Sequence, residues 1–130
     1  LKESREGGIS SFMQKVFTGY TMYFNNKHNR SGSLFQGTFK TSHIKSDGQL
    51  LQLSCYLHGN PQIHKIGRAD NWQWSSYLDF LGKRARRLND KKLILNQFEN
   101  ISEYKNLTDL LIKDFTEQKS ELKAALLEQI

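Results

Sequence analysis

A single proline, Pro61, follows a stretch of apolar and helix-forming residues. Proline disfavours the α conformation in the residue before it, so the sequence predicts a helix that starts at Ser46 and ends near Gly59 or Asn60. Side chains four residues apart share one face of a helix, which places Tyr56 beside Asn60. The end of this helix therefore presents a phenol and a carboxamide together.

These two side chains suggest a specific chemistry. The phenol of Tyr56 can act as an oxygen nucleophile, and the amide oxygen of Asn60 is a neutral, hard ligand for a divalent metal. The pair indicates phosphoryl transfer, provided that further ligands lie elsewhere. A tyrosine that packs at the edge of a buried helix face has the same spacing, and that structural role is the more common one.

Positive charge is concentrated in the first two thirds of the chain. Residues 1–87 hold 13 Lys and Arg against 5 Asp and Glu, whereas residues 88–130 hold 6 against 8. A basic front of this kind favours a polyanionic partner such as nucleic acid, although a solvated basic surface gives the same count. The lone cysteine, Cys55, fits a reducing compartment, and no apolar run approaches the ~20 residues needed to cross a bilayer. The expected location is the cytoplasm.

Hydrophobic periodicity predicts helices before and after one strand. Apolar residues between Ile9 and Phe24 recur at spacings of three and four, which predicts a helix to about Asn25 with its stripe in the core. Residues 33–44 alternate between apolar and polar side chains, which predicts a strand or bent strand.

The C-terminal part of the chain is expected to be helical. The basic run 83–87 marks the sharpest change in composition, so it is interpreted as a linker between a domain over 1–82 and a helical extension over 88–130. Three helices are expected after the proline, the last of them interrupted or polar near residues 117–120: 75–82, around 93–98, and about 104–126.

Other motifs are weak. No two of the four histidines have the spacing of a metal pair, and the sequence has neither a phosphate-binding glycine loop nor a zinc-type cysteine pair. Trp72 and Trp74 fit a core, but they could instead stack on unpaired bases. The run 83–87 fits a solvated linker, or contacts to phosphate that position a strand without reading its sequence.

Three segments in a fixed order resemble a known family. Gly-Ser-Leu-Phe-Gln-Gly-Thr-Phe-Lys occupies residues 32–40, Tyr-Leu-His-Gly-Asn-Pro occupies 56–61, and Trp-Ser-Ser-Tyr occupies 74–77. Together they resemble the C-terminal half of the single-tyrosine HUH transposases, in particular the REP-associated tyrosine transposases of bacteria. The resemblance covers about residues 9–82 and is looser beyond them.

The resemblance implies both a fold and a reaction. The fold class would be α+β, a partial ferredoxin-like domain that is mostly helical here and carries a C-terminal helical tail. Its partner would be single-stranded, hairpin-flanked DNA, and Tyr56 would attack a phosphate to form a 5′-phosphotyrosyl bond. A Mg²⁺ or Mn²⁺ ion would be held by Asn60 and by two histidines of a His-hydrophobic-His strand. Candidate phosphate contacts are Lys40, Arg84, Arg86 and Arg87.

The sequence departs from this family mainly because it contains no His-hydrophobic-His motif, and to a small extent because Gln62 follows the proline where the family usually has an apolar residue. The expectation is therefore a fragment of a bacterial, cytoplasmic enzyme that binds no metal by itself and is inactive without the missing strand. Two alternatives stay open. One is a non-catalytic DNA-binding remnant or domesticated regulator, and the other is an unrelated helical domain that binds another protein.

Overall fold

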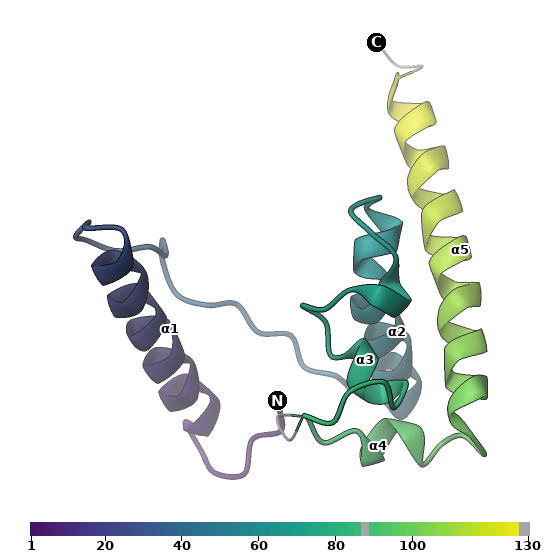
Figure 1. The fold of residues 1–130 in the computed structure, drawn as a ribbon, viewed down its shortest axis with the longest axis horizontal. Coiled ribbons are helices and arrows are strands. Elements are labelled where there is room, and N and C mark those ends of the chain that lie inside the picture. The colour runs from purple at the N-terminus through teal and green to yellow at the C-terminus, as the bar shows by residue number, and fades with distance from the viewer. Residues whose placement is uncertain (87–88, 128–130) are drawn as a thin grey trace. The chain divides into compact units, whose positions relative to one another are not determined.

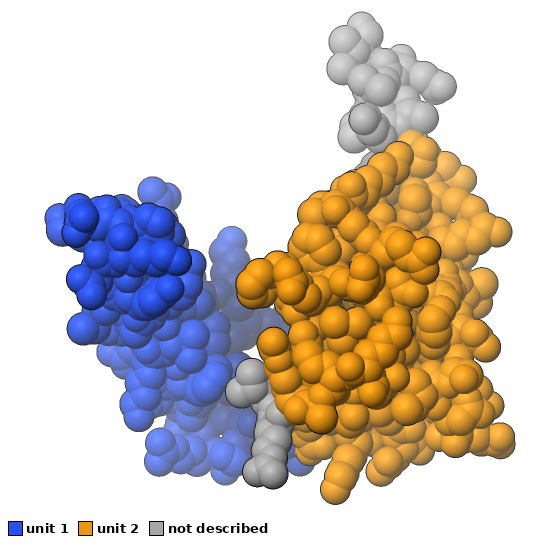
Figure 2. Space-filling view, viewed as in Figure 1, with its two compact units in different colours: residues 1–43 blue, residues 44–130 orange. Residues whose placement is uncertain are grey.

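The computed structural model describes residues 1–86 and 89–127, with side chains described as far as residue 121 within the last helix. The chain divides into two compact units, a first unit of residues 1–43 and a second unit of residues 44–130 (Figures 1 and 2). The predicted linker at 83–87 falls, as far as it is described, inside the second unit.

The expected α+β, ferredoxin-like fold is wrong. Every regular element within residues 1–86 and 89–127 is helical, and none of these residues forms a strand. Residues 33–44, predicted as a strand, form an irregular loop with bends near Leu34, Phe35 and Gly37. A segment with alternating side chains forms a strand only when a neighbouring strand makes hydrogen bonds to its backbone. The first unit supplies no such strand. Phe35 packs instead on a helix, with its ring centre 4.5 Å from that of Phe17.

The first unit contains one long helix, α1 (Gly8–Lys27). Its apolar stripe was expected to form core, yet α1 has no buried residue, and Phe12 and Tyr20 are each 50% exposed. One helix with a single returning segment cannot cover a whole stripe, because burial needs a second packed layer. The loop after α1 is tied back to it by Asn25, whose amide donates to the carbonyl oxygen of Gly32 at 2.9 Å.

The second unit is built on two helices that lie side by side, α2 (Asp47–Ile63) and α5 (Ile101–Leu127) (Figure 1). The predicted start of α2 is confirmed, because the Ser46 hydroxyl accepts from the Gln49 backbone N–H at 3.2 Å and the Gln49 side chain accepts from the Lys45 N–H. Residues further along α2 contact residues further along α5, so the two helices run parallel.

The predicted end of α2 is wrong. The helix continues through Pro61 to Ile63, and the cap is His64. Pro61 and Ile63 are buried, and this burial outweighs the helical hydrogen bond that proline cannot donate. The chain then reverses at Lys65, whose φ of 57° is left-handed, while Ile66 donates back to the Pro61 carbonyl at 2.8 Å.

Short helical segments close the second unit: η1 (Ala69–Asn71), α3 (Tyr77–Phe80) and α4 (Lys92–Leu95). α5 is continuous, so residues 117–120, expected to interrupt the helix or to form a polar part of it, are a polar, exposed part of it. The buried apolar residues come from every helix of this unit: Cys55, Ile63, Ala69, Tyr77, Phe80, Ile94, Tyr104 and Ile112. Among the helices of residues 1–86 and 89–127, none combines the length and apolar character required to span a bilayer.

Candidate functional site

A buried histidine links α2, α5 and the loop before α3. The His58 ring is 5% exposed; its Nδ1 lies 2.7 Å from the Tyr104 hydroxyl and its Nε2 lies 2.9 Å from the Ser76 hydroxyl. Tyr104 is also hydrogen-bonded to Ser54 at 2.7 Å. Burial lowers the pKa of His58 to about 4, because the charged imidazolium would lose its hydration. A neutral His58 with both ring nitrogens bonded is a structural residue.

Acidification is expected to destabilise the second unit through His58. Below about pH 6.5 the His58 imidazole binds a proton in the unfolded chain, whereas in the folded chain it does so only near pH 4. The free energy of unfolding should therefore fall by about 3 kcal/mol between these two pH values. His58→Gln keeps a hydrogen-bonding side chain and removes the titration. Urea unfolding at the two ends of the interval measures the effect, and a variant as acid-sensitive as the native chain would contradict the assignment.

Tyr56 lies at the edge of the core on α2. Its side chain is half-buried, and its ring meets Phe115 of α5 edge-on, with 5.2 Å between the ring centres. Asn60, one turn further along α2, is also half-buried. Its Oδ1 atom is enclosed and has no hydrogen-bond partner within the described chain. Such an acceptor is costly to bury, so it is the orphaned polar atom that a ligand or a metal would satisfy.

The described residues do not form a complete site for the Mg²⁺ or Mn²⁺ that the resemblance implies. Within them, no group of three or more His, Cys, Asp and Glu side chains is placed to hold a metal ion. A single amide oxygen from Asn60 is too few ligands, because Mg²⁺ takes six oxygens and a protein usually holds it through one or two carboxylates together with substrate phosphates.

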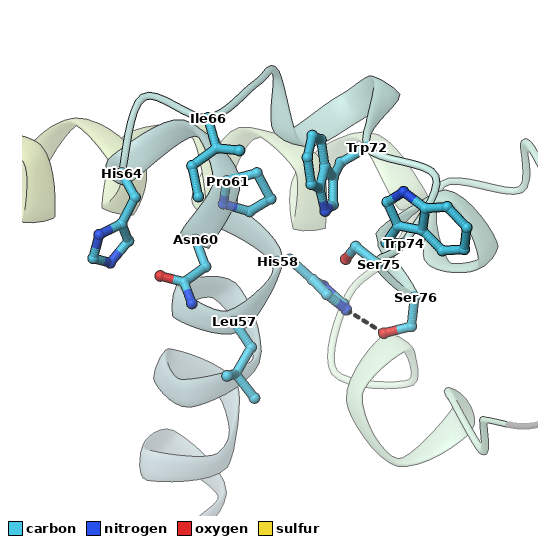
Figure 3. Close-up of a pocket in the computed structure, with 10 residues that line it drawn as sticks. All are labelled: Leu57, His58, Asn60, Pro61, His64, Ile66, Trp72, Trp74, Ser75 and Ser76. Atoms are coloured by element: carbon cyan, nitrogen blue, oxygen red, sulfur yellow. Dashed lines mark hydrogen bonds between the residues drawn. The ribbon is translucent and has the colours of Figure 1, made fainter. Parts of the chain in front are cut away.

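A cavity of about 580 Å³ lies beside Asn60, between the C-terminal part of α2 and the loop of residues 72–76 (Figure 3). Trp74 stands at this cavity with 78% of its surface exposed. The lining residues come from both sides: Leu57, His58, Asn60, Pro61, His64, Ile66, Trp72, Trp74, Ser75 and Ser76. None of these ten is acidic, so the cavity has no carboxylate to repel an anion.

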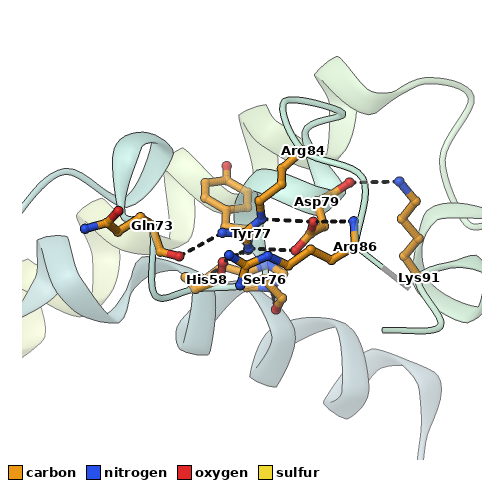
Figure 4. A network of polar contacts seen from close by, with 9 residues as sticks. His58, Gln73, Ser76, Tyr77, Asp79, Arg84, Arg86 and Lys91 are labelled. Carbon is orange, nitrogen blue, oxygen red and sulfur yellow. Dashed lines mark hydrogen bonds and ion pairs between the residues drawn. The ribbon is translucent and has the colours of Figure 1, made fainter. Parts of the chain in front are cut away.

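The loop beside the cavity is held by a buried ion pair (Figure 4). Asp79 is 2% exposed and accepts two hydrogen bonds from Arg84, at 3.1 and 2.7 Å, and one from the Arg86 backbone N–H. The Arg84 guanidinium also donates to the Gln73 carbonyl at 2.8 Å and to the Ser75 carbonyl at 2.6 Å. The guanidinium beside Asp79 lowers the pKa of that carboxyl.

The structure therefore places the predicted phosphate contacts in different surroundings. Arg84 is engaged within the chain, whereas the side chains of Arg86 and Lys40 are exposed. Lys40 belongs to the first unit, and Arg87 lies outside the described residues.

Sequence reasoning missed Asp79 and gave His58 no particular role. A weak signal for Asp79 exists, because an acidic residue stands inside an apolar helical segment five residues before Arg84. The partners of His58 lie 18 and 46 residues away in the chain, so no local pattern identifies them.

No protein-family model, curated protein or solved structure matches this chain.

Proposed function

We propose that this chain binds single-stranded, hairpin-flanked DNA in the bacterial cytoplasm. We further propose that Tyr56 is the nucleophile of a transposase-type strand transfer when these residues are joined to a His-hydrophobic-His strand. The observation that carries the binding proposal is the cavity beside Asn60, with the exposed indole of Trp74 at its mouth. Exposed aromatic rings within basic surroundings are typical of proteins that bind single strands.

Charge supports the same partner. Residues 61–87, which include the cavity loop, hold six Lys and Arg against two Asp. Both of these aspartates are paired with arginines, Asp70 with Arg68 and Asp79 with Arg84. The remaining cations leave this part of the chain with an excess of positive charge, which favours a phosphate backbone.

The proposed transfer needs one nucleophile. The Tyr56 oxygen would attack a DNA phosphorus, the Oη–P bond would form, and the bond from phosphorus to the 3′ oxygen would break. The phenol proton leaves to solvent, and the departing 3′ oxygen takes up one proton from solvent, so the products are a 5′-phosphotyrosyl bond and a free 3′-hydroxyl. Phe115 packs on one edge of the Tyr56 ring and limits how it can turn.

A covalent adduct tests the nucleophile. A polypeptide that joins these residues to a His-hydrophobic-His strand is incubated with a hairpin-flanked single strand and Mg²⁺, and the adduct is followed by denaturing electrophoresis. Tyr56→Phe should abolish the adduct and change strand affinity by less than about twofold, since the ring and its packing are kept. An adduct that persists in this variant would assign the nucleophile elsewhere.

A second candidate is a DNA-binding module that cuts nothing. The absence, among the described residues, of any group of three or more His, Cys, Asp and Glu side chains placed to hold a metal ion favours it. Under this candidate the chain binds the strand with a steep dependence on salt, Mg²⁺ and Mn²⁺ only weaken binding as competing counterions, and no adduct forms. Metal titration of strand binding separates the two functions.

A further inference from the structure

We infer that the cavity beside α2 receives one unpaired nucleobase, stacked on Trp74, and that Arg84 positions the indole for it. This inference rests on the proposed binding of single-stranded DNA. It adds that Trp74 stacks on the base, that Arg84 positions Trp74, and that the base must be unpaired.

Trp74 is held outward rather than buried. Trp74 is 78% exposed, whereas Trp72 of the same loop is half-buried and packs against Gly67. A large, flat and exposed ring presents a stacking face to any base, whatever the sequence of the strand.

Arg84 fixes the backbone on both sides of that ring. Its guanidinium donates to the carbonyl oxygens of Gln73 and Ser75, the two neighbours of Trp74 (Figure 4). The same group is locked to Asp79 by two further hydrogen bonds. With four hydrogen bonds made by its five N–H groups, Arg84 has little left to offer a phosphate. The loop is thus ordered before a strand arrives, which reduces the entropic cost of binding.

The opposite side of the cavity suits the edges of a base. Leu57 and Pro61 of α2 supply apolar surface, and Asn60 supplies an amide (Figure 3). The cavity volume of about 580 Å³ exceeds what one base needs and falls within the usual range for ligand sites. A base in a duplex would have to unpair and unstack before it could enter, so duplex DNA should bind less well.

The ligand requirement is tested with the 130-residue chain and fluorescently labelled single strands of about 12 nucleotides at low salt. Trp74→Leu should weaken binding about 5- to 150-fold, and Trp74→Phe, which keeps an aromatic face, should weaken it far less. Strand binding should quench tryptophan fluorescence in the native chain and less so in Trp74→Leu. Equal affinity of Trp74→Leu and the native chain, or equal affinity for duplex and single strand, would overturn the inference.

The positioning role is tested by a double-mutant cycle. Arg84→Lys keeps the charge but cannot reproduce the four hydrogen bonds, so it should weaken strand binding about 3- to 10-fold in the native background and little in Trp74→Leu. The dependence of affinity on salt should keep its slope. An equal loss in both backgrounds, or a slope reduced by about one, would make Arg84 a phosphate contact instead. The Trp74 variants change an exposed side chain and decide the base site even if Arg84→Lys fails to fold.

Failure of the inference and failure of the proposed function give different results. If neither the native chain nor any variant binds single-stranded DNA at low salt, both the inference and the proposed function are wrong. If the native chain binds with a steep salt dependence but Trp74 variants bind equally well, only the base site is wrong.

Discussion

Replacing Gly59 with valine is expected to destabilise the second unit by about 3 kcal/mol, near the upper end of the usual cost of overpacking a core. Gly59 is buried where α2 meets α5. A Cβ atom built on Gly59 would overlap Cγ1 of Ile112, a buried residue of α5, and would lie 3.3 Å from the Ile63 side chain. Because Cγ1 is attached directly to Cβ, Ile112 cannot swing clear without changing its rotamer or separating the helices.

Gly48 provides the matched control on the same helix. A Cβ at Gly48 meets nothing within 4 Å, so Gly48→Val should change stability by less than about 0.5 kcal/mol, and valine is the slightly better helix former. Urea unfolding followed by circular dichroism measures both variants. Ile112→Ala should be less harmful in the Gly59→Val background than in the native chain, since it removes the overlapping atoms. Similar losses at Gly48 and Gly59 would refute close helix packing at this point.

The start of α2 could be predicted from the sequence because its signals are local. Ser46 and Gln49 satisfy the first backbone N–H groups of α2 from within one turn, so four residues carry the information. The existence of α5 was predictable for a similar reason, since a long periodic pattern specifies a helix regardless of its neighbours. Its continuity through residues 117–120 was not, because a polar stretch can stay helical when flanking turns are anchored.

The errors arose where distant contacts decide the outcome. Pro61 opposes a helix locally, yet α2 extends past it because Pro61 and Ile63 are buried. Residues 33–44 carry a strand pattern, but a strand is stable only beside another, and the pattern cannot say whether one is present. The expected α+β fold failed for the same reason.

The candidate site was predictable in part. Helical spacing places Tyr56 and Asn60 one turn apart on α2, but their surroundings differ: Asn60 lines a cavity, whereas Tyr56 packs on Phe115. The exposure of Trp74 could not be predicted, because it depends on a carboxylate and a guanidinium that fix its loop. Composition gives a prior for burial, and only the surrounding contacts decide an individual case.

Asp79→Ala is expected to lower the melting temperature of the second unit by about 10 to 20 °C, because it breaks a buried, hydrogen-bonded ion pair. The carboxylate holds Arg84 through two bonds and the Arg86 backbone N–H through a third. The carbonyl of Asp79 also accepts from Lys91 at 2.8 Å, so the residue joins the cavity loop to the chain that leads into α4. Thermal unfolding followed by circular dichroism measures the loss.

Asp70→Ala is the matched control, since Asp70 pairs with Arg68, whose side chain is 79% exposed. An exposed pair contributes little, so this variant should melt within about 3 °C of the native chain. The stabilisation by Asp79 should also disappear in acid: with its pKa lowered in the folded state, the contribution is present above the unfolded pKa near 3.8 and is lost as the pH falls below it. Equal melting shifts for the two variants would show that Asp79 is not the anchor of this loop.

The consequence for binding follows from the same contacts. Without Asp79, the Arg84 guanidinium is no longer held in place, so its bonds to the carbonyls on either side of Trp74 loosen as well. Asp79→Ala should therefore weaken single-strand affinity even at a temperature where the variant is fully folded, although it removes a negative charge that would otherwise repel phosphate. Simple electrostatics predicts the opposite sign. Tighter binding by Asp79→Ala than by Asp70→Ala, which removes the same charge from the surface, would mean that charge and not loop order governs the site.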